Sequence, residues 1–342
     1  MESASFRQAL PWLGPDLQTL RDSLSPEAPW EASRGLRRSS LLAIPVPATP
    51  WQVGGALLAH WDRPAGPTRA VVLLLHGLGG CSRRRGVRRL ASRLLERGCA
   101  VLRLNLRGAG EGRGLIAGSY AARCSEDLAP VLAEARRIAT HLGRDAGGSP
   151  LPLLGAGLSL GGTILIHACL DLKGNRGPVL DGLVCASSPL DLERCSRSIE
   201  RPRNGLYQAW LLERLKRQAL SDAGDSPPER AIRSLGSIRA FDALITAPRW
   251  GHATVAEYYR RASPLRRLQR EEPAALPPLL VLQARDDPWV PADGAAELQD
   301  LQAKQGLPAL EVVISDRGGI TASIHRRDAG PMPRWWRGWS AI

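Results

Sequence analysis

The sequence predicts an α/β fold, with a mostly parallel sheet of eight strands flanked by helices. Short apolar runs alternate with segments of helical periodicity, as in chains that cross back over a parallel sheet. The runs are almost continuously apolar, as strands buried on both faces are. At 342 residues and 44% hydrophobic content, the chain can bury one large core. We therefore expect residues 1–342 to form a single domain.

The first two expected strands lie too close together in the chain for a helix between them, so they should be antiparallel. From residue 70 onward, each strand is followed by a helix or a long insertion, which is typical of parallel connections. The expected strands are 40–46, 55–61, 70–75, 99–105, 151–156, 181–186, 278–284 and 309–315. The expected helices with adequate 3.6-residue periodicity are 82–97, 126–142, 161–172 and 292–304.

The strand rhythm stops between residues 191 and 273, where a charged, helical pattern intervenes. This insertion follows the sixth strand, which is the usual place for a helical cap over an active site. We expect residues 191–273 to form such a cap. The alternative is an extension that serves packing alone.

The apolar run 151–156 leads directly into Gly157-Leu158-Ser159-Leu160-Gly161. This pattern predicts a strand that turns sharply into a helix with Ser159 at the apex, the arrangement called a nucleophile elbow. Glycines two positions either side are needed because larger side chains would collide with the neighbouring strand and helix. The helix expected next would direct the positive end of its dipole at Ser159.

A serine nucleophile needs a base, a carboxylate that orients the base, and donors for the oxyanion. The expected donors are the backbone N–H groups of Leu160 and of Leu78, which follows the third strand in a glycine-rich loop. We expect His76 in that loop to be structural, because it precedes the turn and comes too early in the chain order of serine, acid and histidine.

The acid is expected after the seventh strand, where Asp286 and Asp287 compete. Asp287 has the better register, four residues before Pro291, so we expect Asp286 to be a turn or supporting residue. The base is expected after the eighth strand in a Gly-Gly-His loop, but Ile320 occupies that place. His325, five residues later, is the remaining candidate base.

The formal charge of +13 comes almost entirely from arginine, since only three lysines are present, and that composition is typical of a GC-rich genome. The run 83–89 alternates with apolar positions and predicts the solvated face of an amphipathic helix. Aromatic residues do not interleave these arginines as in a single-strand binder. We therefore expect no nucleic-acid partner and at most peripheral contact with a membrane. Tight DNA binding with a steep salt dependence would favour the alternative hypothesis, a basic nucleic-acid-binding protein.

Six scattered cysteines without a Cys-x-x-Cys pair predict neither a zinc site nor a disulfide framework, so we expect no metal. The N-terminal residues lack the pattern of a secretory signal, and no apolar run is long enough to span a membrane. These features favour a soluble, cytoplasmic protein. The oligomeric state stays open.

Together these segments resemble the YheT-like branch of the α/β-hydrolase superfamily, which contains yeast medium-chain ethyl-ester synthases/esterases and ABHD-type lipases. The resemblance covers most of the chain. It rests on Asp16-Leu17-Gln18-Thr19, Asn105-Leu106-Arg107-Gly108, Tyr120 with Glu126-Asp127, the elbow, Phe241-Asp242, and Glu257-Tyr258-Tyr259 with Ser263. It implies that Ser159 is the nucleophile and Asp287 the acid, acting without a cofactor on small carboxylic esters or thioesters of short to medium acyl chains.

Two departures from the family pattern stand out. Asp16 replaces the usual histidine of the N-terminal segment, and the family's Gly-Gly-His-x-Gly-Phe becomes Gly-Gly-Ile-Thr-Ala-Ser at 318–323. One choice of codons for residues 320–324 reads His-Gly-Phe-His when started two bases later. Residues 320–342 are therefore either a frameshifted tail or a divergent native one, with His325 as replacement base. We accordingly expect a serine ester hydrolase, intact or impaired; the alternative is a non-catalytic binding protein with the same fold.

Overall fold

The computed structural model describes residues 14–24, 36, 39–172, 179–222, 226–270 and 276–319. Eight strands form one sheet in the order β1-β2-β4-β3-β5-β6-β7-β8. β1 pairs antiparallel with β2, β2 pairs antiparallel with β4, and all later pairings are parallel. The strands are β1 (Ser40–Val46), β2 (Gly55–Asp62), β3 (Ala70–Leu75), β4 (Cys99–Leu104), β5 (Leu153–Leu158), β6 (Gly182–Ala186), β7 (Leu279–Ala284) and β8 (Leu310–Ser315).

The predicted fold class is confirmed, and every expected strand is present within two residues of its expected bounds. The largest shift is in β5, which begins at Leu153 and runs on to Leu158, whereas the sequence predicted 151–156. Pro152 has no N–H to donate to a neighbouring strand, which disfavours an earlier start. Gly155 inside β5 leaves room for the Leu180 side chain, because an added Cβ would lie 2.7 Å from a methyl carbon of Leu180. The strand therefore runs directly into Ser159.

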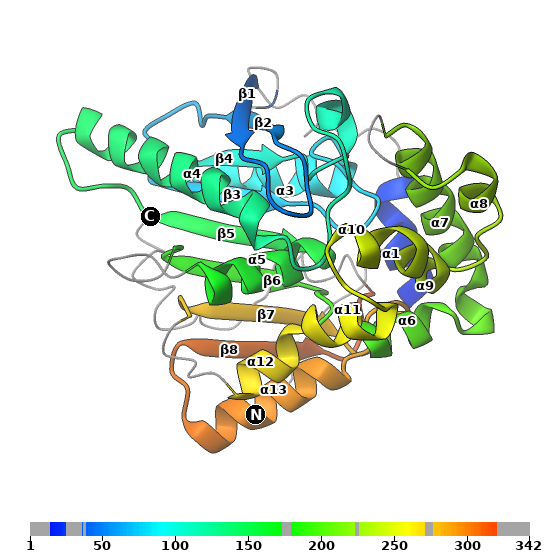
Figure 1. Cartoon of the computed structure of the whole chain (residues 1–342). Coiled ribbons are helices and arrows are strands. Elements are labelled where there is room, and N and C mark those ends of the chain that lie inside the picture. The colour runs from blue at the N-terminus through cyan, green and yellow to red at the C-terminus, as the bar shows by residue number, and fades with distance from the viewer. Residues whose placement is uncertain are drawn as a thin grey trace.

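Alternate residues of the central strands face opposite layers of helix. Leu74 and Val101 pack with Val87 of α3 (Arg85–Glu96), whereas Leu73 and Leu102 belong to the larger core on the other face. That larger core includes apolar residues of α4 (Ser125–Asp145), α5 (Leu160–Asp171), α12 (Pro264–Arg270) and α13 (Asp293–Gln305). Figure 1 shows α4, α12 and α13 in front of the sheet.

The segment between β6 and β7 folds into helices with an apolar cluster of their own. Leu211, Leu215, Ile232 and Phe241 are members of that cluster. Figure 1 shows these helices gathered beyond the carboxyl ends of the parallel strands. They are α6 (Leu192–Ile199), η3 (Pro202–Asn204), α7 (Gly205–Leu220), α8 (Glu229–Arg233), α9 (Ile238–Phe241), η4 (Asp242–Thr246), α10 (Ala247–Arg249) and α11 (Val255–Arg261), followed by α12.

A further helix, α1 (Pro15–Leu24), contacts this insertion through Asp16. The Asp16 carboxylate accepts a hydrogen bond from the Tyr207 hydroxyl at 2.9 Å and pairs with Arg203 at 3.3 Å. Asp16 therefore joins α1 to the beginning of α7. In the described part of the chain, no helix has both the length and the apolar character needed to cross a membrane.

Candidate active site

Ser159 occupies a strained turn between β5 and α5. Its φ of 52° and ψ of −127° put it in a region that residues with a side chain rarely adopt. A Cβ on Gly157 would collide with the backbone of Gly161 and Gly162, and a Cβ on Gly161 would lie 2.7 Å from the carbonyl oxygens of Leu75 and His76. Both elbow glycines are therefore sterically required.

The glycine-rich loop after β3 lies directly against Ser159. A Cβ on Gly77 would be 2.8 Å from the Cβ of Ser159 and 3.3 Å from its Oγ. The loop is held in place by the N–H of Gly79, which donates to the Tyr120 hydroxyl at 2.7 Å. Leu78 and Leu160 line the same cavity as Ser159, so both expected oxyanion donors belong to residues at this site.

His76 lines the cavity but has both ring nitrogens engaged. Its Nδ1 donates to the carbonyl of Gly77 at 2.8 Å, since a carbonyl can only accept. Its Nε2 then carries the lone pair and accepts from the N–H of Leu106 at 3.3 Å. Burial lowers the His76 pKa to about 4, which keeps the ring neutral. This arrangement suits a residue that braces the loop.

The two neighbouring aspartates after β7 face different partners. Oδ1 of Asp287 accepts from the backbone N–H groups of Trp289 at 2.9 Å and Val290 at 3.0 Å, and the side chain of Asp287 is buried. Burial raises the Asp287 pKa to about 7, although these hydrogen bonds oppose the shift. Asp286 instead accepts the N–H of Gly319 at 2.8 Å.

Two residues that contact Asp287 did not stand out in the sequence. The Ser187 hydroxyl donates to the Asp287 carboxylate, and Nε2 of Gln283 lies 3.4 Å from its Oδ2. Ser187 directly follows β6 and has a φ of 48°. The sequence does contain a pattern that indicates a turn at this edge: two serines and a proline, residues 187–189, follow an apolar strand.

The cavity around Ser159 has a volume of about 570 Å³. One wall comes from the turns at the carboxyl ends of the strands, which contribute Leu78, Ser159 and Leu160. The opposite wall comes from the insertion between β6 and β7, and a mainly apolar space lies between the two walls. The insertion residues on that wall are Leu192, Ile199, Trp210, Leu211, Leu215, Ile238, Phe241, Tyr258 and Tyr259.

Hydrogen bonds connect Asp242, Thr246 and Tyr259 of the insertion at this wall. The Tyr259 hydroxyl donates to Oδ2 of Asp242 at 2.8 Å, and the Thr246 hydroxyl donates to Oδ1 at 2.7 Å. Burial raises the Asp242 pKa to about 6. The Tyr258 hydroxyl accepts from the N–H of Ala122 at 2.9 Å, which ties the insertion to the loop before α4.

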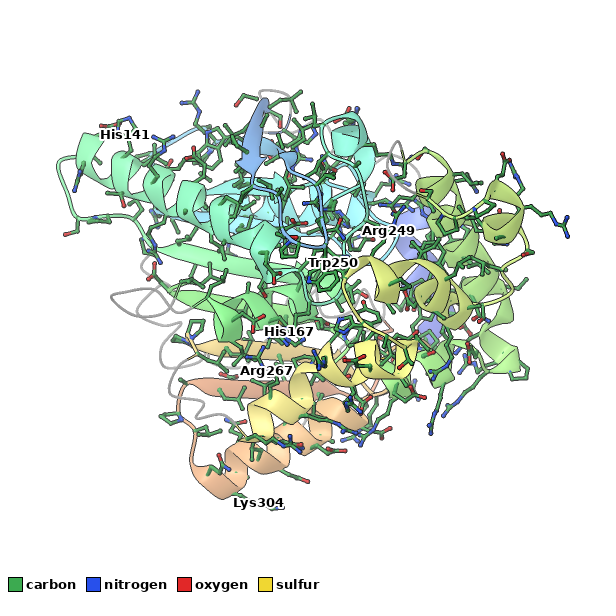
Figure 2. All side chains as sticks on the ribbon, in the orientation of Figure 1. His141, His167, Arg249, Trp250, Arg267 and Lys304 are labelled. Carbon is green, nitrogen blue, oxygen red and sulfur yellow. The ribbon has the colours of Figure 1, made fainter. Side chains whose placement is uncertain are left out.

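The second buried histidine, His167, lies in α5 and does not line the cavity. Its Nε2 donates to the carbonyl of Ala262 at 3.0 Å, and its Nδ1 faces a terminal nitrogen of Arg267 at 3.3 Å, a pair that Figure 2 labels side by side. Burial lowers its pKa to about 4. His167 thus joins α5 to α12 as a packing residue.

Both positions considered for the base follow Gly319, the last residue that the structure describes. Ile320 and His325 lie outside the described residues, as does the whole expected tail 320–342. Of the histidines within the described ranges, only His76 lines the cavity. Within those ranges, no group of three or more histidine, cysteine, aspartate or glutamate side chains could hold a metal ion.

An eight-stranded, mostly parallel sheet with a serine at a strained turn between strand and helix defines an α/β hydrolase of the serine type. The chain belongs to the Hydrolase_4 family, described as serine aminopeptidase, S33, whose model matches residues 66–309.

Curated relatives confirm the resemblance to the YheT-like branch. The chain is 35% identical over 179 residues to "Putative esterase YheT" of Escherichia coli, covering 51% of this chain and 49% of that protein. It is 29% identical to mouse phospholipase ABHD3, covering 74% and 58%, and 27% identical to the medium-chain fatty acid ethyl ester synthase/esterase 2 of Saccharomyces cerevisiae, covering 75% and 58%. The chain thus spans 49% to 58% of the length of these relatives.

Solved structures agree on the fold. The esterase Pf2001 of Pyrococcus furiosus superposes with a TM-score of 0.54 at 15% identity, covering 93% of this chain and 92% of that one. At that level of identity, the similarity concerns the fold alone.

Proposed function

We propose that this protein is a serine hydrolase of small carboxylic esters or thioesters with short to medium acyl chains. The observation that carries the proposal is Ser159, placed at a strained turn that opens into a cavity of about 570 Å³ with a mainly apolar lining. Such a cavity suits an acyl chain, and the turn exposes the hydroxyl to it. The insertion that forms the outer wall, residues 191–273, acts as the cap.

In the proposed reaction, the Ser159 hydroxyl attacks the ester carbonyl and the leaving alcohol or thiol departs, which leaves an acyl-enzyme that water hydrolyses. The backbone N–H groups of Leu78 and Leu160 stabilise the oxyanion. Asp287 orients the imidazole that takes the serine proton. That imidazole is His325 in the present sequence, or a histidine after Gly319 if the reading frame is restored.

Labelling with a fluorophosphonate probe tests the nucleophile. We expect the wild-type chain to be labelled on Ser159 and the Ser159→Ala variant to remain unlabelled. Ser119 also lines the cavity, so Ser119→Ala is the matched control, and this variant should still be labelled on Ser159. Labelling that persists unchanged in Ser159→Ala would refute the assignment.

A second candidate function is a non-catalytic binding protein that keeps the pocket. It is favoured by Ile320 in the place expected for the base, and by the engagement of both nitrogens of His76. Under this function the chain binds an ester without labelling or turnover, and Ser159→Ala binds it with unchanged affinity.

We also propose a cytoplasmic location, at most peripheral membrane contact and no nucleic-acid partner. All six cysteines are free thiols, which fits a reducing compartment. Measuring the distribution of the tagged protein between cell fractions tests the location.

A further inference from the structure

The arginine run at residues 83–89, after the glycine-rich loop, is not wholly solvated as the sequence predicted, because part of it lines the cavity. The sequence placed residues 83–89 on the solvated face of a helix, but α3 begins only at Arg85, and Arg89 is buried. Arg83 and Arg84 therefore belong to the loop before the helix. Both line the cavity around Ser159, and so does Arg85.

The cavity wall carries a marked excess of positive charge. Arg214 and Arg249, from the insertion, line it in addition to the three arginines at residues 83–85. Among the described lining residues, Asp242 is the single carboxyl group, and its two oxygens accept hydrogen bonds from the Tyr259 and Thr246 hydroxyls. A substrate with a negative charge would therefore be attracted into this cavity.

Two of these arginines are already paired with carboxylates. Arg83 pairs with Glu111 at 2.6 Å. Arg249, labelled in Figure 2 beside Trp250, pairs with Asp222 at 2.8 Å. In these two pairs, the carboxylates of Glu111 and Asp222 balance the charges of Arg83 and Arg249.

Arg84 and Arg214 converge on one aromatic ring. The guanidinium carbons lie 5.4 Å and 4.8 Å from the ring centre of Trp210, and within the described ranges neither side chain has a carboxylate at ion-pair distance. Burial lowers the pKa of Arg84, because water is partly removed from its charge. Cation–π contacts fix the two planar groups in place without neutralising them.

The pair lies on the side of the cavity where the oxyanion donors are expected. Nε of Arg214 donates to the carbonyl of Gly79 at 2.9 Å, next to Leu78, and the charge of Arg84 contributes to the lowered pKa of His76. Arg84 is also the N-terminal cap residue of α3, a helix with no side-chain cap bond there and no acidic residue in its first turn. The positive end of that helix therefore adds to the same field.

We propose that Arg84 and Arg214 bind an oxyanion, a carboxylate or a phosphate-type group, carried by the substrate, so that the cavity selects anionic esters over neutral esters of equal length. The ester part of this inference rests on the proposed function. The anion site itself depends only on the two arginines and Trp210.

Isothermal titration calorimetry with non-hydrolysable amides tests the anion site on the full chain. The probes are N-hexylsuccinamic acid, N-hexyl-3-phosphonopropanamide and the neutral N-hexylbutanamide. We expect at least one anionic amide to bind about tenfold more tightly than the neutral one at low salt, because hydrogen bonds between charged groups are stronger than those between neutral groups. The preferred anion identifies the class of substrate. The preference should shrink at high salt.

Variants assign that preference to the two residues. Arg84→Gln and Arg214→Gln should each reduce the ratio of affinities, the double variant should abolish it, and Arg84→Lys should keep part of it. Arg217→Gln is the matched control, because Arg217 is exposed on the same helix as Arg214 and does not line the cavity. Equal wild-type affinity for all three amides, or an unchanged ratio in a folded double variant, would overturn the inference.

The results separate this inference from the proposed function. Hydrolysis of neutral and anionic esters with equal kcat/KM would leave the hydrolase standing and remove the anion site. A preference for the anionic amides in a chain whose Ser159 is never labelled would keep the anion site and remove the hydrolase.

Discussion

The backbone N–H of Gly319 donates a hydrogen bond to Asp286 at 2.8 Å. Gly319 also lies against α1, because an added Cβ would be 2.6 Å from the carbonyl oxygen of Pro15, and its φ is 52°. The end of the loop after β8 is thus held from two sides, next to the buried Asp287. We infer that this contact gives Asp286 a supporting role and sets the point from which the segment with the expected base departs.

The buried carboxyl of Asp287 should give stability a specific pH dependence. Its pKa is raised to about 7 in the folded chain, from 3.8 when exposed, so the folded state binds this proton more tightly. Its contribution is complete below about pH 4 and is lost as the pH rises through about 7, by roughly 1.4 kcal/mol per unit of pKa shift. Asp287→Asn keeps an acceptor for the N–H groups of Trp289 and Val290 but removes this titration. Urea unfolding should therefore show a smaller loss of stability from pH 5 to pH 8 in the variant.

Asp286→Asn is the control for that measurement, because Asp286 faces Gly319 instead. It should retain the wild-type difference between pH 5 and pH 8. Identical differences in wild type and Asp287→Asn would show that Asp287 does not carry the titration.

The buried ion pair of Arg107 and Asp127 should be important for stability. Nε and Nη2 of Arg107 donate to the two oxygens of Asp127 at 2.8 and 2.7 Å, and both side chains are at most 2% exposed. Arg107→Gln leaves an uncompensated buried carboxylate and should cost about 3–5 kcal/mol in the free energy of unfolding. Urea denaturation measures this loss, and exposed Arg93→Gln should leave the midpoint unchanged. A midpoint for Arg107→Gln equal to that of the control would contradict the prediction.

The elbow should not accept a methyl group at Gly157. A Cβ there collides with backbone atoms of Gly161 and Gly162, which cannot move aside as a flexible side chain can. Gly157→Ala should therefore abolish fluorophosphonate labelling or prevent folding. Gly205→Ala, at the start of α7 with open space around its Cα, should label like wild type. Normal labelling of Gly157→Ala would mean that the turn is less crowded than the structure shows.

The alternative reading frame after Gly319 should restore a base. A positioned general base contributes about 10²–10⁴-fold, so the frame-restored protein should hydrolyse short p-nitrophenyl esters faster by at least that order. Sequencing the gene around the Gly318 codon comes first, and spectrophotometric assay of both proteins follows. In the restored protein, Asp287→Asn should lower the rate by about 10⁴, as neutralising a triad acid does elsewhere. A restored protein that stays inactive yet binds an ester tightly would favour the binding function.

Local patterns in the sequence predicted the sheet and the elbow, because both depend on neighbours in the chain. Apolar runs of strand length located all eight strands, and glycines either side of Ser159 indicated a turn that only small residues permit. Helix boundaries were less accurate. The expected helix 82–97 begins at Arg85, so periodicity alone could not show that Arg83 and Arg84 line a cavity.

The sequence by itself therefore determined the fold class and the strained position of Ser159, since backbone sterics act within a few residues. Only the tertiary structure decided that Ser187 and Gln283 contact Asp287, that Gly319 meets Asp286, and that Arg84 and Arg214 meet at Trp210. These partners lie on different strands, loops and helices. They come together because the strand order brings the carboxyl ends of the parallel strands to one edge, and the insertion after β6 packs over that edge.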